Sequence, residues 1–157
     1  MVATPSPETS TLTWIRRFLL LSLALGVIGT AGELVLLGHI ESPAQWLPLV
    51  ALVLSIPLLL WHARWPGKAS VRMLQLLMIV FVAFGLVGVG LHYDGNAEFE
   101  RELHPDDAGM TYLGHVVAGA TPVLAPGSMV LLGLVGMAHA YRHPSAAAGV
   151  NRQERVS

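Results

Sequence analysis

The chain has 157 residues, of which 54% are hydrophobic and only 12% are charged, and its mean hydropathy is +0.60. This composition excludes an ordinary soluble domain, because too few polar residues are present to cover an apolar interior in water. Cysteine is absent, which excludes disulfides, thiolate metal sites and iron–sulfur clusters, and the net charge of -1 becomes informative only when the charges are placed along the chain.

Four apolar runs have about the 20 residues that a helix needs to cross a bilayer. They cover residues 14–37, 44–61, 71–91 and 122–141. We therefore predict an all-α, polytopic membrane protein: a four-transmembrane-helix bundle over residues 14–142, with a long outer loop between helices 3 and 4. Residues 1–13, rich in Pro, Ser and Thr, and residues 143–157 are predicted to be disordered cytoplasmic tails.

The first run also has features of a secretory signal. Arg16 and Arg17 precede it, and the small residues 29–31 resemble a cleavage site. However, the apolar run resumes after Gly32 and continues to Leu37, which gives a length better suited to a spanning helix. We expect a retained transmembrane helix.

Two ionisable groups end stripes of small residues. In the first span two glycines precede Glu33 with spacings of three and four, and in the third span two glycines precede His92 in the same way. Small residues mark the contacts between membrane helices, so Glu33 and His92 are predicted to form a buried polar pair in the outer half of the bundle. A carboxyl group inside a span costs on the order of 3 kcal/mol unless it is paired or hydrated, which favours a functional role for Glu33.

The basic residues define the orientation. All but Arg101 fall on one side of the predicted membrane: Arg16, Arg17, Arg64, Lys68, Arg72, Arg142, Arg152 and Arg155. Short cytoplasmic loops keep Lys and Arg, so this distribution predicts a multi-pass protein of the plasma (inner) membrane with both termini cytoplasmic.

The outer loop, residues 92–121, is predicted to contain two short helices, 97–103 with Asn96 as N-cap and 107–118. Histidines and carboxylates coincide on this face, and together they suit zinc, copper(II), iron or manganese. The wider cluster includes Glu33, Asp94, Asn96, Glu100 and Glu102. The predicted metal ligands are His39, Glu41, His92, Glu98, His104 and His115. The alternative is a solvated acidic cap that binds no metal.

The inner face and the known motifs give weaker signals. His62, His139 and His143 lie near arginines at predicted span ends, where we expect them to extend toward anionic lipid headgroups. No phosphate-binding glycine loop, nucleophile elbow or HExxH motif occurs, and scattered basic residues give no support for nucleic-acid binding.

These observations predict a small integral membrane protein, an accessory or subunit that binds a cation or a partner at its acidic, histidine-bearing outer face. The sequence does not identify a cofactor, and a divalent metal is the candidate. The predicted partners are the lipid bilayer and either further copies of the chain or a larger membrane complex. Two alternatives stay open. One is a proton-coupled small-molecule transporter, acting as a dimer, in which Glu33 changes its protonation state; the other is a membrane metalloenzyme acting on a lipid or quinone-like substrate.

The predicted orientation can be tested with reporter fusions. Alkaline phosphatase fused after Ser157 should be inactive, because that end is expected in the cytoplasm, whereas a fusion at Asp106 in the outer loop should be active. A fluorescent protein should show the opposite pattern. Phosphatase activity at Ser157 would overturn the topology.

Overall fold

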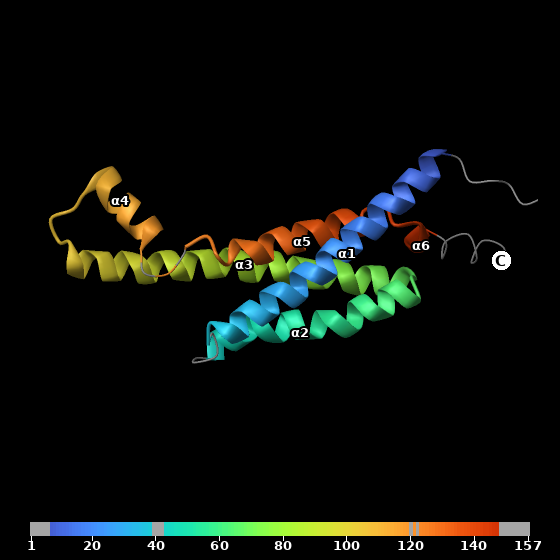
Figure 1. The fold of residues 1–157 in the computed structure, drawn as a ribbon, viewed down its shortest axis with the longest axis horizontal. Coiled ribbons are helices and arrows are strands. Elements are labelled where there is room, and N and C mark those ends of the chain that lie inside the picture. Colours follow the sequence, from blue (N-terminus) through green and yellow to red (C-terminus); the bar gives the residue numbers. More distant parts are fainter. Residues whose placement is uncertain (1–6, 39–42, 120, 122, 148–157) are drawn as a thin grey trace, which may run out of the picture.

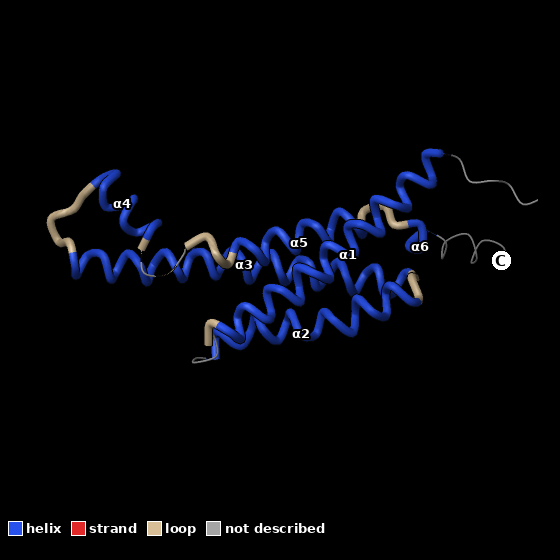
Figure 2. The backbone as a smooth tube through the Cα atoms, in the orientation of Figure 1, coloured by secondary structure: helices blue, strands red, loops and turns tan. Residues whose placement is uncertain are grey.

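The computed structural model describes residues 7–38, 43–119, 121 and 123–147, and every regular element in these ranges is a helix (Figures 1 and 2). The prediction of an all-α chain is confirmed for this part. The helices are α1 (Pro7–Leu36), α2 (Pro43–Arg64), α3 (Lys68–Leu103), α4 (Gly109–Ala118), α5 (Gly127–Ala140) and α6 (Pro144–Ala147).

Three helices, α1, α2 and α3, are long and apolar enough to cross a membrane. Their large apolar side chains also point outward, and Phe18, Leu25, Leu60 and Leu86 are among those that are exposed. A helix that is apolar all round needs an apolar surrounding, which lipid supplies. The helical structure therefore fits a membrane-embedded protein.

The fourth predicted span is shorter than expected. Only Gly127–Ala140 is helical, about 21 Å at 1.5 Å per residue, which is less than the roughly 30 Å of hydrocarbon. Pro126 stands at the N-cap and residues 123–126 form turns, because proline lacks the amide proton that a helix interior requires. The chain thus enters α5 through non-helical backbone.

The predicted separate helix at 97–103 is wrong. These residues continue α3, which runs unbroken for 36 residues, or about 54 Å. Gly95 alone does not stop the helix, and the Glu, Arg and Leu residues that follow are good helix formers. The second predicted outer helix is confirmed as α4, which starts two residues later than expected.

The tails also differ from the prediction where the structure describes them. Residues 7–13 belong to α1 and residues 144–147 form α6, so these parts of the predicted tails have helical backbone. Residues 1–6 and 148–157 lie outside the described ranges.

The long helices and α5 pack side by side. α1 contacts α2 and α5, and α3 contacts α2 and α5. The start of α1, the link between α2 and α3, and α6 lie at one end of the molecule, whereas α4 lies at the other end beside the last turns of α3 (Figure 1). The buried core draws on all four of the packed helices: Leu23, Val27, Ala51, Leu52, Leu59, Leu74, Met78, Phe81, Met129 and Leu132.

The contact between α3 and α5 is a close backbone approach. A Cβ atom added to Gly85 of α3 would lie 2.8 Å from the backbone nitrogen of Val130 and 2.9 Å from the carbonyl oxygen of Pro126. On the α5 side, a Cβ at Gly133 would lie 2.8 Å from the carbonyl oxygen of Met78. Backbone atoms cannot move aside as a flexible side chain can, so glycine is required on both helices.

Replacing Gly85 with Ala should therefore push α3 and α5 apart and destabilise the protein by about 1–3 kcal/mol, the usual cost of overpacking. Thermal unfolding in detergent measures the effect. Gly90→Ala on the same helix is the matched control, since no described atom lies within 4 Å of where its Cβ would stand. Equal melting temperatures for the two variants would contradict the close-contact interpretation.

Candidate functional site

Two groups of potential metal ligands lie at opposite ends of α3. Glu100, His104 and His115 form the outer cluster, and His62, His139 and His143 form the inner cluster. Within each cluster the three ligand atoms lie within 4.8 Å of one another. These are the groups of three or more such ligands found among the described residues.

The outer cluster combines two helices. Glu100 and His104 are four residues apart on α3, which places both on one face of the helix, and the Oε2 atom of Glu100 lies 3.0 Å from Nδ1 of His104. His115 comes from α4, and its ring centroid lies 5.2 Å from that of His104. Glu100 is buried, whereas the two histidines are about half exposed. The cluster is therefore open to ligands from one side.

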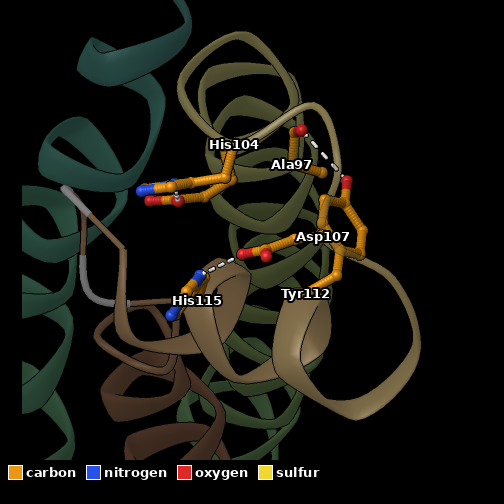
Figure 3. A network of polar contacts seen from close by, with 6 residues as sticks. Ala97, His104, Asp107, Tyr112 and His115 are labelled. Carbon is orange, nitrogen blue, oxygen red and sulfur yellow. Dashed lines mark hydrogen bonds and ion pairs between the residues drawn. The ribbon is translucent and has the colours of Figure 1, made fainter.

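Asp107 adds a second carboxylate beside this cluster (Figure 3). Its Oδ2 atom lies 2.8 Å from Nδ1 of His115. That oxygen is shielded from solvent, and among the described residues no group forms a hydrogen bond with it. Its contact with His115 is therefore an ion pair when the imidazole is protonated. Glu100, His104 and His115 thus bring their ligand atoms together, and Asp107 lies beside them in contact with His115.

Asn96 holds α4 in place over α3. Its side-chain nitrogen donates to the carbonyl oxygens of Val116 and Thr121, at 2.9 and 2.7 Å, and its side-chain oxygen accepts from the amide and hydroxyl of Thr121. Gly119 packs directly against this side chain. On the other side of α4, the hydroxyl of Tyr112 donates to the carbonyl oxygen of Ala97 at 3.0 Å (Figure 3). These bonds fix the position of His115.

The structure brings together only some of the predicted metal ligands. His104 and His115 meet in the outer cluster, but Glu98 is exposed on another face of α3, where it lines a shallow hollow. His92 precedes His104 by twelve residues, about 18 Å along α3. His39 and Glu41 lie outside the described residues.

Sequence reasoning placed Glu100 in the wider cluster but not among the metal ligands. The spacing of four between Glu100 and His104 was the signal that could have found it. Asp107 had no such signal, because its place depends on how the loop to α4 folds.

Glu33 is exposed on α1 rather than buried. Gly26, on the stripe that precedes it, packs against Leu132 of α5, but no described atom lies within 4 Å of where a Cβ of Gly29 would stand. The glycine stripe of α1 has thus lost its neighbour before it reaches Glu33, although Ala31 and Leu34 still pack against the core. His92 is half-buried on α3, and no contact between the two is found among the described residues, so their pairing stays a prediction.

The inner histidines do not extend toward lipid headgroups as expected. His62 and His139 are buried, with 2% and 3% of their surfaces exposed, and His143 is half-buried. Burial lowers the pKa of His143, and the neighbouring His139 and the Arg16 guanidinium lower it further, so that its imidazole is neutral near pH 7. Neutral imidazole is the form that binds metals.

Comparison with protein-family models, with curated proteins and with solved structures finds no match for this chain.

The role of Asn96 can be tested by its removal. Asn96→Ala leaves buried partners without hydrogen bonds, which costs about 1–3 kcal/mol for such groups, and should release α4 from α3. Hydrogen exchange of the amides in residues 109–118 should then become faster, while Glu98→Ala, an exposed change on the same helix, should leave it unaltered. Unchanged protection of α4 in Asn96→Ala would show that other contacts hold this helix.

Proposed function

We propose that this chain is a multi-pass inner-membrane protein that binds a divalent metal ion at its outer surface, through Glu100, His104 and His115 with Asp107 alongside. The observation that carries the proposal is the return of α4 onto α3, which places His115 beside the Glu100–His104 pair. The protein would act as an accessory in metal handling, taking up or passing on the ion at the membrane surface.

The donor set supports a borderline divalent ion. Zinc takes imidazole nitrogen and carboxylate oxygen in four-coordinate sites, and manganese and copper(II) accept the same groups. Two carboxylates would balance the charge of a divalent ion when both histidines are neutral. The two histidines are about half exposed, so one coordination position can stay open to a partner or a substrate. The metalloenzyme alternative would use that same open position.

The orientation is also part of the proposal. The basic residues at the start of α1, in the link from α2 to α3 and after α5 favour a cytoplasmic location for that end of the molecule. These segments lie together, opposite α4 (Figure 1). Four crossings result when α5 and the turns at 123–126 together make the fourth passage. In these turns the carbonyl oxygens of residues 124–126 accept hydrogen bonds from the amides of residues 127–129, which satisfies part of the non-helical backbone within the segment itself.

The exposure of Glu33 favours a second candidate, the proton-coupled transporter. A carboxyl group on the surface of an apolar helix must be hydrated, protonated or paired, and in a single chain it faces outward. A second copy of the chain would cover it. In that proposal Glu33 exchanges its proton for a substrate at the interface between two copies.

Zinc titration of the purified protein tests the outer site. The double variant Glu100→Gln, His115→Ala should bind one zinc ion per chain fewer than the unchanged protein, because it loses two ligands. Glu98→Gln is the matched control, an exposed carboxylate on α3 that should bind as the unchanged protein does. Binding at the outer site should also weaken as the pH falls, because protons compete with the metal ion for the imidazole nitrogens.

Two results would reject the proposal. One is the same zinc stoichiometry and affinity in the double variant and in the unchanged protein. The other is equal loss of binding in Glu98→Gln, which would indicate that the acidic surface attracts the ion without a defined site.

A further inference from the structure

The inner histidines are far from the outer cluster and take no part in the proposed function. His62 lies in the last turn of α2, His139 in the last turn of α5, and His143 three residues after α5 ends. The ring centroids are 5.1 Å apart for His62 and His139, 5.1 Å for His62 and His143, and 5.4 Å for His139 and His143. Three imidazoles from two helices and the following turn thus surround one point.

We propose that His62, His139 and His143 bind a single transition-metal ion, zinc or copper, at the inner end of the helices. The donor set consists of imidazole alone, which suits these two metals, and three histidines leave the fourth position of a tetrahedral ion free.

In both His62 and His139, the Nδ1 atom lies at hydrogen-bonding distance from an oxygen atom, which leaves Nε2 on the side of the proposed metal ion. Nδ1 of His139 lies 2.9 Å from the carbonyl oxygen of Arg16, which can only accept, so this nitrogen carries the proton and Nε2 has a free lone pair. Nδ1 of His62 lies 3.0 Å from the hydroxyl oxygen of Ser70. Metal-binding histidines usually donate their other nitrogen to a backbone carbonyl or a similar oxygen, which fixes the ring.

The Nε2 atoms of His62 and His139 face each other at 3.0 Å, so in this arrangement the Nε2–H of His62 donates a hydrogen bond to Nε2 of His139. When an ion binds between them, the proton of His62 moves from Nε2 to Nδ1, where the Ser70 hydroxyl oxygen accepts the hydrogen bond. The two nitrogens then need to separate only to roughly 3.3 Å, the spacing of two ligands at about 2.05 Å on a tetrahedral ion.

Ser70 can accept that bond without losing its other partners. Its hydroxyl oxygen also accepts from the amide of Gly67 at 3.0 Å, and its hydrogen can point to the carbonyl oxygen of Gly67 at 3.1 Å. The supporting residues therefore accommodate the ion by moving protons, with little change in side-chain positions.

The surrounding charges allow a cation here despite the nearby arginine. The C-terminal ends of α2 and α5 converge on the site, and the carbonyl groups of a helix end carry partial negative charge. The Arg16 guanidinium is itself held by two of these oxygens, those of Tyr141 and Arg142, at 3.3 and 3.2 Å. Its charge is thus partly balanced by the end of α5, and it would favour an anion at the open fourth position.

His143 is the third ligand of the proposed site and the best residue to replace in a test of metal binding. Its Nδ1 accepts a hydrogen bond from the amide of Ser145 at 3.3 Å, a long contact that coordination would replace. Because His143 is half-buried and lies outside the long helices, its removal should leave the fold intact, whereas His62 is fully enclosed.

The experiment uses the full chain with the outer cluster removed by His104→Ala and His115→Ala, so that failure of the outer site does not affect the result. Zn²⁺ and Cu⁺ are titrated separately, and the loaded protein is studied by X-ray absorption. We expect one ion per chain with imidazole nitrogens at about 2.0 Å. Adding His143→Ala should weaken binding at least about tenfold while the melting temperature without metal stays the same.

His92→Ala in the same background is the matched control and should bind as its parent does. His62→Gln should abolish binding, and if it fails to fold, His143→Ala still decides the question. The proposal is overturned if neither ion binds to the parent, or if the parent and His143→Ala bind with equal affinity.

Discussion

The close approach of α3 and α5 is the constraint on which the rest of the molecule depends. Lipid offers apolar helices no reason to associate, so their contact rests on backbone surfaces that fit together, and Gly85 and Gly133 make that fit. Once α5 lies against α3, the last turn of α5 places His139 at the end of α2, in contact with His62. The segment before α5 is drawn along α3 toward Asn96, which in turn fixes α4. One helix contact therefore organises both histidine clusters.

The fold could be predicted from the sequence where the length and composition of a single helix are sufficient. Length and apolar content were enough to find α1, α2 and most of α3, because a spanning helix is set by the thickness of hydrocarbon. The errors arose where two signals competed. Asn96 has the chemistry of an N-cap, so it suggested a new helix, but its side chain bonds to Val116 in the last turn of α4 and to Thr121 after it, and α3 continues past Asn96. The fourth apolar run begins before Pro126, and its hydrophobic residues concealed how short α5 is.

The candidate sites depended on information that a linear pattern lacks. His104 and His115 were suggested by composition, and Glu100 was available from its spacing to His104. The inner cluster was missed because His62 and His139 are 77 residues apart and each stands beside arginines, which is also what a histidine at a lipid surface looks like. A buried histidine cluster and histidines at a lipid surface can be distinguished only by knowing that the ends of α2 and α5 lie together. The exposure of Glu33 in the single chain was not foreseen, since a glycine stripe does not show how far along the helix its neighbour follows.

The length of α3 has a mechanical consequence. About 27 Å of continuous helix lies between Gly85, which contacts α5, and the C-terminal end of α3 at Leu103. A tilt of about 10° about Gly85 would therefore move the end of α3 sideways by roughly 5 Å. In the proposed orientation, a change in helix packing at the cytoplasmic end would displace the end of α3 on the outer side, and a protein bound there could alter that packing in return.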